Sequence, residues 1–149
     1  MKVITSNHYG GNLTNIVMKD ENNSIVVVFE DKSTVLGNKI IVYNNDGGAI
    51  YFLDEDITQD YDAFNLMKDS NVLFNVKRDD NIVHRVIKIE NRGSEYTFSA
   101  LNRTLHIDGN KIAKLNINRD NSFAIDLHDD NNMEQNVTLL YTIFLLIAT

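Results

Sequence analysis

The chain of 149 residues contains no cysteine, no proline and no tryptophan. Without cysteine it has no disulfide framework, no thiolate nucleophile and no cysteine-based zinc site, which is compatible with a reducing compartment. Without proline, its turns depend on Asn, Asp and Gly, and no strand edge is protected by a proline ring. A sheet built from this sequence is therefore best closed on itself, because closure removes exposed edges.

Basic residues are also few, with 14 Lys and Arg against 21 Asp and Glu and a net charge of −7. Neutralising nucleic-acid phosphates requires clustered Lys and Arg, so this balance argues against a general nucleic-acid binder. The N-terminal segment MKVITSNHYGGNLTN contains no apolar stretch of the kind that a secretory signal requires. We expect a cytoplasmic protein.

The sequence lacks the motifs G-x-S-x-G, Walker A, G-x-G-x-x-G and H-E-x-x-H. Among its histidines, His106 and His128 fall on the polar faces of predicted strands, which favours solvent exposure over metal binding. A metal-dependent enzyme would instead need His84, His106 and His128 to converge in a cleft. We therefore expect no enzymatic activity, no cofactor and no metal site.

An acidic stretch runs from Asp54 to Asp62 and contains Glu55, Asp56 and Asp60 as well. It lacks the central glycine and the distant glutamate of an EF-hand loop. A charged surface loop is the preferred interpretation of this stretch.

Apolar residues fall in short clusters bounded by Asn, Asp and Gly, the pattern of serial β-hairpins. Near the C-terminus, Phe123, Ile125 and Leu127 alternate with polar residues, as expected for a strand with one wet face. The dipeptide Asp108-Gly109 supplies the positive-φ pair that a tight primed turn prefers. The predicted strands cover residues 2–5, 15–18, 24–30, 39–43, 49–53, 63–67, 72–77, 82–89, 95–101, 104–107, 111–117 and 122–128.

Residues 136–148, NVTLLYTIFLLIA, form an apolar run that contrasts with the polar, Asn-rich chain before it. As a helix the run covers roughly 20 Å, short of the roughly 30 Å hydrocarbon layer, so it predicts a helix buried in the protein and no transmembrane span. A barrel of about 12 strands encloses a lumen too wide for side chains alone, and a helix apolar on all sides is the expected filler. Because Val, Ile, Thr and Tyr favour strands, a further strand is the alternative for this run.

These patterns predict a single domain over residues 1–149 of the mainly β class. We expect a closed antiparallel barrel of about 12 strands in serial hairpins, built around a buried hydrophobic C-terminal helix over residues 132–148.

Three segments carry a resemblance to a known family: KIIVYNNDGGAIYFL (39–53), TLHIDGNKIAKLNI (104–117) and SFAIDLHDDNNMEQNVTLLYTIFLLIA (122–148). Their hairpin, hairpin and strand-to-helix patterns resemble the tubby C-terminal-like superfamily, in particular the small LURP-one-related and phospholipid-scramblase-like proteins. The resemblance spans nearly the whole chain. It implies a twelve-stranded barrel around a C-terminal helix and lipid or membrane association as in some relatives. The Trp-Gly pattern common in such proteins is missing here, since the chain contains no tryptophan.

Basic residues concentrate in one part of the chain, because residues 72–119 hold nine basic side chains against five acidic ones while both flanks are acidic. Anionic headgroups attract Lys and Arg by about 1 kcal/mol each near a membrane surface, so a gathered set would bind phospholipids. Solvated outward strand positions are the simpler interpretation. The candidate ligand-binding residues of this basic face are Lys77, Arg78, Arg85, Lys88, Arg92 and Arg103.

Two hypotheses for function follow, both for a non-enzymatic barrel that acts by surface recognition. The first, which follows from the resemblance, is a lipid- or membrane-peripheral recognition module with anionic phospholipid headgroups as its partners. The alternative is an acidic cytoplasmic protein-interaction module that uses residues 54–62 to neutralise or regulate a basic protein.

Overall fold

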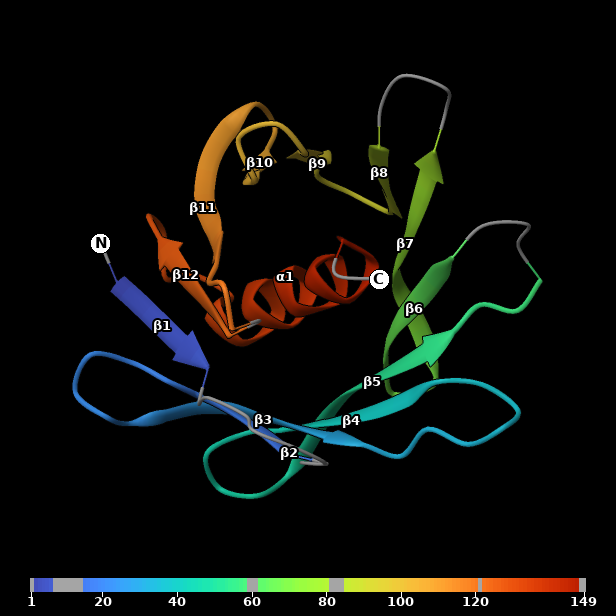
Figure 1. Ribbon diagram of the computed structural model, residues 1–149, viewed down its shortest axis with the longest axis horizontal. Helices are drawn as coiled ribbons and strands as arrows, with labels where there is room; N and C mark the ends of the chain where they lie inside the picture. The colour runs from blue at the N-terminus through green and yellow to red at the C-terminus, as the bar shows by residue number, and fades with distance from the viewer. Residues whose placement is uncertain (1, 7–14, 59–61, 81–84, 121, 148–149) are drawn as a thin grey trace.

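The computed structural model describes residues 2–6, 15–58, 62–80, 85–120 and 122–147, which form twelve β-strands and one C-terminal helix (Figure 1). The elements are β1 Lys2–Ser6, β2 Asn15–Lys19, β3 Ile25–Asp31, β4 Lys39–Tyr43, β5 Ala49–Glu55, β6 Ala63–Lys68, β7 Asn71–Asp80, β8 Arg85–Asn91, β9 Tyr96–Ser99, β10 Thr104–Ile107, β11 Asn110–Ile117, β12 Phe123–Leu127 and α1 Met133–Ile147.

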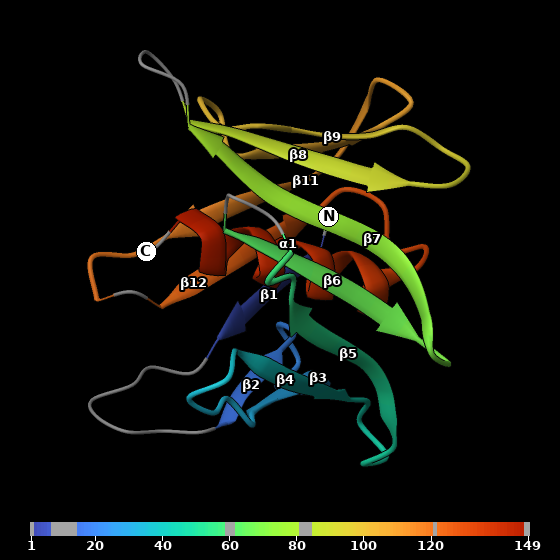
Figure 2. The same cartoon turned by 90° about the vertical axis from the view of Figure 1, so that its right-hand side faces the viewer.

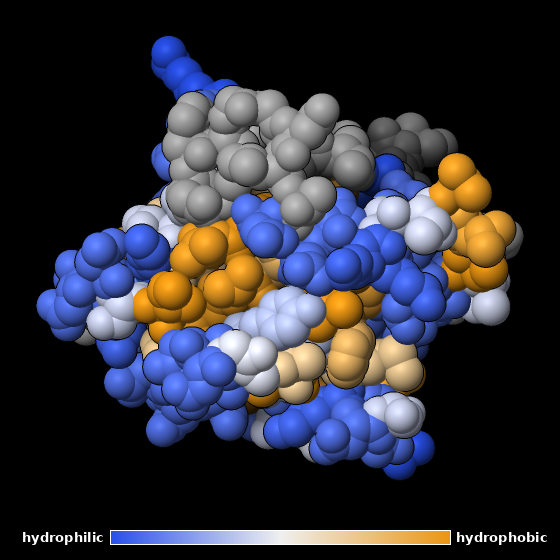
Figure 3. All heavy atoms as spheres, turned by 90° about the horizontal axis from the view of Figure 1, so that it is seen from below, coloured by the Kyte–Doolittle hydropathy of each residue, from blue (hydrophilic) through white to orange (hydrophobic). Residues whose placement is uncertain are grey.

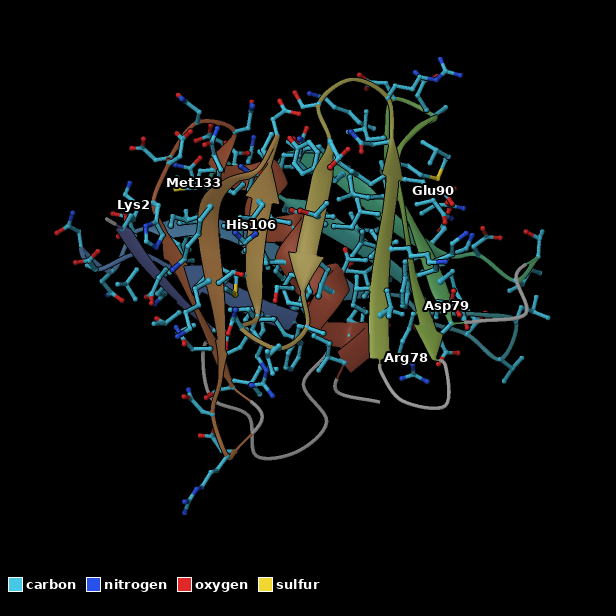
Figure 4. All side chains as sticks on the ribbon, turned by 90° about the horizontal axis from the view of Figure 1, so that it is seen from above. Lys2, Arg78, Asp79, Glu90, His106 and Met133 are labelled. Atoms are coloured by element: carbon cyan, nitrogen blue, oxygen red, sulfur yellow. The ribbon has the colours of Figure 1, made fainter. Side chains whose placement is uncertain are left out.

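The strands form one antiparallel sheet in the order β8-β7-β6-β5-β4-β3-β2-β1-β12-β11-β10-β9. Most pairs are sequence neighbours, and the pairing of β1 with β12 joins the two halves of the sheet. The sheet curls into a nearly closed barrel around α1, with its outermost strands β8 and β9 side by side (Figures 1 and 4). The predicted mainly β barrel of about 12 strands is confirmed.

Side chains that point alternately inward and outward along each strand explain why one face of the sheet is apolar and buried. Ile125 on β12 lies between Ile4 on β1 and Leu115 on β11, and each of these three side chains is at most 1% exposed. The intervening Ala124 and Asp126 face outward and are only partly buried. A period of two along each strand thus builds a continuous apolar lining inside the barrel.

Tight turns connect many of the strands, and their residues accept left-handed backbone conformations. Asp108 and Gly109 have φ angles of 50° and 82°, as the sequence predicts for this turn. Asp69 and Ser70 in the turn between β6 and β7 have φ angles of 51° and 66°. Short polar side chains tolerate this region better than larger ones, which is why the hairpins form without proline.

The helix α1 fills the barrel lumen, so the predicted buried helix is confirmed and the alternative of a further strand is wrong (Figure 2). Of the predicted range 132–148, residues 133–147 are helical and residue 148 lies outside the described residues. Tyr141 stacks on Phe29 of β3 with ring centroids 3.9 Å apart, and Phe144 stacks on Phe123 of β12 at 4.5 Å. These aromatic contacts form one cluster that attaches the helix to β3 and β12, which only β2 and β1 separate in the sheet.

Two buried threonines of α1 satisfy their hydroxyl groups within the helix. Thr138 Oγ1 donates a hydrogen bond of 2.7 Å to the Glu134 carbonyl, and Thr142 Oγ1 donates one of 2.9 Å to the Thr138 carbonyl. Because both hydroxyls bond to the carbonyl four residues earlier, they need no partner in the barrel wall. The helix can therefore be buried on all sides.

Candidate functional site

Arg78 lies on the inner side of β7, in register with the buried residues Phe74 and Val76 of the same strand. Its Nη1 donates a hydrogen bond of 2.9 Å to the Leu146 carbonyl in the last turn of α1, and its Nη2 lies 3.0 Å from Asp62 Oδ2. In Figure 4 it is seen at the end of the barrel where α1 ends. Since a cation there satisfies a helix C-terminal carbonyl, Arg78 joins the wall to the helix and does not belong to an outer basic face.

Lys77 and Lys88 face outward and stand directly opposite each other on β7 and β8. Lys77 Nζ lies 2.8 Å from Glu90 Oε1, and Lys88 Nζ lies 2.8 Å from Asp79 Oδ2. The two carboxylates lie on the right-hand side of the barrel in Figure 4. They offset the repulsion between the opposed lysines, so this part of the outer face is electrically balanced.

The remaining candidates lie at opposite ends of the barrel. Arg92 is exposed in the turn between β8 and β9, at the end where α1 begins. Arg103 is exposed in the turn between β9 and β10, at the end where α1 ends. Arg85 begins β8, and its side chain lies outside the described part of the structure. The described members of the predicted set therefore do not gather on one face.

A groove on the outer face of β10 and β11, extending into the turn 100–103, brings a different set of cations together. Its volume is about 1000 Å³, and its lining contains Arg103, His106, Lys111 and Lys114 but no carboxylate. Figure 4 looks onto this part of the barrel, with His106 labelled. We call it the basic groove.

A β-bulge explains how Lys111 and Lys114 reach the same face. Residues three apart on a regular strand point to opposite faces. The register of β10 and β11 shifts by one residue, so that Leu105 pairs with Ala113 while His106 pairs with Lys111. Ile112 and Ala113 are consequently both buried, and the lysines on either side of them are both exposed. A bulge of this kind is not visible in the alternation of the sequence.

Cross-strand register surrounds the basic groove with hydrogen-bond donors. Lys111 stands opposite His106, and Lys114 stands opposite Thr104, whose other neighbour on β9 is Ser99. Directly opposed residues have Cβ atoms about 4.5 to 5.5 Å apart, so two ammonium groups, an imidazole and hydroxyls lie within reach of one ligand. This donor set suits a phosphate or carboxylate group.

The cations of the basic groove are not neutralised by described residues. Within that part of the chain, Arg103, Lys111 and Lys114 form no ion pair. The nearest acidic neighbour in register is Asp126, opposite Lys114 on β12, and its Oδ2 accepts a hydrogen bond of 3.1 Å from Asn116 Nδ2. The groove therefore carries a local positive charge on a protein whose net charge is −7.

Described carboxylates of the acidic stretch 54–62 make local contacts. Glu55 Oε2 accepts a hydrogen bond of 2.9 Å from the Asn38 backbone N–H, and Asp56 Oδ1 accepts bonds from the backbone and the hydroxyl of Thr58. Asp62 pairs with Arg78, as described above. Asp60 lies outside the described residues. These carboxylates thus order loops at the end of the barrel where α1 ends.

The histidines form no metal centre with the other described residues. His106 is partly buried on β10, His128 is exposed after β12, and His84 lies outside the described residues. Among the described residues, no three His, Asp or Glu side chains gather as metal ligands would. In the same residues, no helix is long and apolar enough to cross a membrane.

The fold and groove define a twelve-stranded antiparallel barrel with a helix in its lumen and a basic depression on its outer wall. The sequence matches no protein-family model and no curated protein. The fold is similar to the X-ray structure of a protein from Arabidopsis thaliana, with a TM-score of 0.60 and 14% sequence identity over 99% of this chain and 90% of that chain. This likeness concerns the fold alone.

Proposed function

We propose that the protein is a non-enzymatic, membrane-peripheral recognition module whose basic groove binds the anionic headgroups of phospholipids. The observation that carries the proposal is the set of Arg103, Lys111 and Lys114 in one groove without a carboxylate in its lining. By contrast, Lys77 and Lys88 on the same barrel are balanced by Glu90 and Asp79. The groove thus offers an anion three neighbouring cations that form no ion pair with described residues.

The expected strength of this interaction follows from the charge of the groove. Each Lys or Arg near an anionic bilayer contributes about 1 kcal/mol, so three cations contribute about 3 kcal/mol, or roughly a hundredfold preference over a neutral surface. The net charge of −7 opposes approach to the same bilayer. Because the cations are exposed, added salt screens the attraction. The module therefore binds reversibly and in a salt-dependent manner.

We also propose that the chain is a member of the tubby C-terminal-like superfamily. The support is architectural, since a twelve-stranded barrel around a C-terminal helix is what the resemblance implies, and the described helix and strands form that arrangement. Lipid association in some members of that group agrees with a groove that attracts anions. The alternative role, binding a basic protein through residues 54–62, has less support because Glu55, Asp56 and Asp62 already bond within the chain.

Vesicle sedimentation tests the proposed function with a matched pair of variants. The groove variant is Lys111→Gln with Lys114→Gln, and the control is Lys77→Gln with Lys88→Gln, which makes the same chemical change to the same net charge. On vesicles of phosphatidylcholine with phosphatidylserine, we expect the groove variant to bind at least about tenfold more weakly than the parent protein, and the control to bind within about threefold of it. Equal losses in both variants, or no enrichment of the parent on anionic over neutral vesicles, contradict the proposal.

A further inference from the structure

The two ends of the barrel differ sharply in the polarity of their turns. Because the sheet is antiparallel, successive connections alternate between the end where α1 begins and the end where α1 ends, as the side view in Figure 2 shows. The six turns at the first of these ends contain only polar residues and glycine. They are residues 20–24, 44–48, 69–70, 92–95, 108–109 and 128–132.

The end where α1 begins is also strongly acidic. Its six turns carry eight carboxylates and one arginine, Arg92. In the described loops at the opposite end, three cations balance three carboxylates. Those cations are Lys32, Arg103 and Arg119, and the carboxylates are Asp56, Asp62 and Asp120. Among the described turn and loop residues, the excess negative charge is therefore concentrated at one end of the barrel.

The end of the barrel where α1 ends exposes large apolar side chains. Val35, Leu36, Ile57 and Leu101 are 103%, 85%, 75% and 92% exposed, more than any other large hydrophobic residue described. All four lie in loops at the end where α1 ends. A group of hydrophobic residues also projects at the right-hand edge of Figure 3, where Figure 1 places the hairpin between β3 and β4. We call these four residues the apolar rim.

Backbone hydrogen bonds fix the outermost part of the apolar rim. The Thr34 N–H donates to the Gly37 carbonyl at 3.0 Å and the Gly37 N–H donates to the Thr34 carbonyl at 3.2 Å, so Val35 and Leu36 are the two central residues of a tight turn. Turns of this kind normally contain Gly, Asn, Asp or Ser. A Cβ built on Gly37 would lie 4.0 Å from Ile57 Cγ2, so the two loops adjoin. An ordered turn therefore presents apolar side chains where polar ones are usual.

We infer that the apolar rim is the surface that enters the bilayer, with the axis of the barrel steep to the membrane and the acidic end turned away from it. The inference rests on the proposed function and adds the orientation of the bound protein. The apolar side chains of the rim lie on separate loops. A bilayer interface suits such an arrangement, because each side chain can enter the lipid without a pocket that matches its shape. Leu101 also lines the basic groove beside Arg103, so one contact places a headgroup at the cations and an apolar side chain toward the acyl chains. Repulsion of the acidic turns by an anionic surface favours the same orientation.

Single-tryptophan fluorescence tests the inference, because the natural chain contains no tryptophan. The reporters are Leu36→Trp, Ile57→Trp and Leu101→Trp on the apolar rim. The controls are Ile25→Trp and Val72→Trp, at residues 40% and 53% exposed on the strand ends next to the acidic turns. Circular dichroism and the urea unfolding midpoint establish that each variant is folded.

On vesicles of phosphatidylcholine with phosphatidylserine, we expect the rim tryptophans to shift their emission to shorter wavelength and to be quenched by lipids brominated on their acyl chains. The two control tryptophans should show neither change. We further expect Leu36→Asp combined with Ile57→Asp, two rim residues outside the lining of the basic groove, to weaken vesicle binding at least tenfold. The same double variant should bind water-soluble dihexanoyl phosphatidylserine as well as the parent protein does.

The outcomes separate this inference from the proposed function. If the parent protein sediments with anionic vesicles but rim and control tryptophans respond alike, the orientation is wrong and the headgroup proposal stands. If the parent protein does not sediment with these vesicles, both fail. A shift of the rim emission that depends on protein concentration without vesicles would assign the apolar rim to a contact between two copies of the chain, and would overturn the inference.

Discussion

Arg78 Nη1 lies 2.9 Å from the carbonyl oxygen of Leu146 and donates a hydrogen bond to it. Arg78 belongs to β7 and Leu146 to the last turn of α1, so the bond joins the wall of the barrel to the helix in its lumen. Asp62 holds the other side of the guanidinium at 3.0 Å. Unlike Lys77 beside it, which faces outward, Arg78 has a structural position on the inner side of the strand.

Replacing Arg78 by methionine should lower the free energy of unfolding by about 1.5 to 3 kcal/mol, the cost of losing a hydrogen bond to a charged donor. Urea denaturation measures the change. Arg92→Met is the matched control, since Arg92 is exposed in a turn, and its effect should stay within about 0.5 kcal/mol. Equal effects of the two substitutions would mean that the contact between Arg78 and the helix contributes nothing to stability.

Leu140→Ala should destabilise the protein by about 2 to 5 kcal/mol, because Leu140 is fully buried in the centre of α1 and its removal leaves a cavity. Changing Leu145 to alanine should lower the free energy of unfolding clearly less, because Leu145 lies near the end of the helix and is partly exposed. Equilibrium unfolding in urea compares the two. A larger loss at Leu145 would contradict the placement of α1 inside the barrel.

Tyr51 and Tyr96 should ionise above the ordinary tyrosine pKa of 10.0 while the protein is folded. Burial raises the pKa of both phenols; Glu134 raises that of Tyr51 further, while a hydrogen bond with Gln135 partly offsets the rise at Tyr96. Since these phenols ionise more readily in the unfolded chain, their contribution to stability should be constant below about pH 10 and be lost as the pH rises through the folded-state pKa values.

Absorbance at 295 nm during an alkaline titration measures this ionisation. Tyr51→Phe and Tyr96→Phe should each remove a late-titrating component and leave the early one in place. If both substitutions remove only tyrosines that titrate near 10.0, the two side chains are not buried as described.

Much of the fold could be predicted because local patterns and packing agree. The ranges predicted for 39–43 and 104–107 are those of β4 and β10, and the turn at Asp108-Gly109 has the expected positive φ angles. Other strands differ from their predicted ends by a few residues, since hydrogen bonds to a neighbouring strand extend pairing beyond the apolar cluster. Of the predicted strand 82–89, residues 82–84 lie outside the described residues.

The site was harder to predict because two features of tertiary structure decide it. Arg78 follows Phe74 and Val76 at intervals of two residues along β7, so the sequence indicates that its side chain faces inward. Its hydrogen-bond acceptor, however, is a helix carbonyl 68 residues away in the chain. Lys111 and Lys114 share a face only because of the bulge at β11. Of the candidate residues, Arg103 lines the basic groove, whereas Lys111 and Lys114 lie in the basic region 72–119 but outside the candidate set.

The central claim, that anionic headgroups bind in the basic groove, is tested most directly by following backbone amide signals in ¹H–¹⁵N correlation spectra during titration with dihexanoyl phosphatidylserine. We predict that the largest saturable shifts fall on residues 99–106 and 111–116, that residues 77–90 move little, and that Lys111→Gln with Lys114→Gln abolishes the response. The largest shifts on β7 and β8 or on the acidic turns, or no saturable shift at all, would contradict the account.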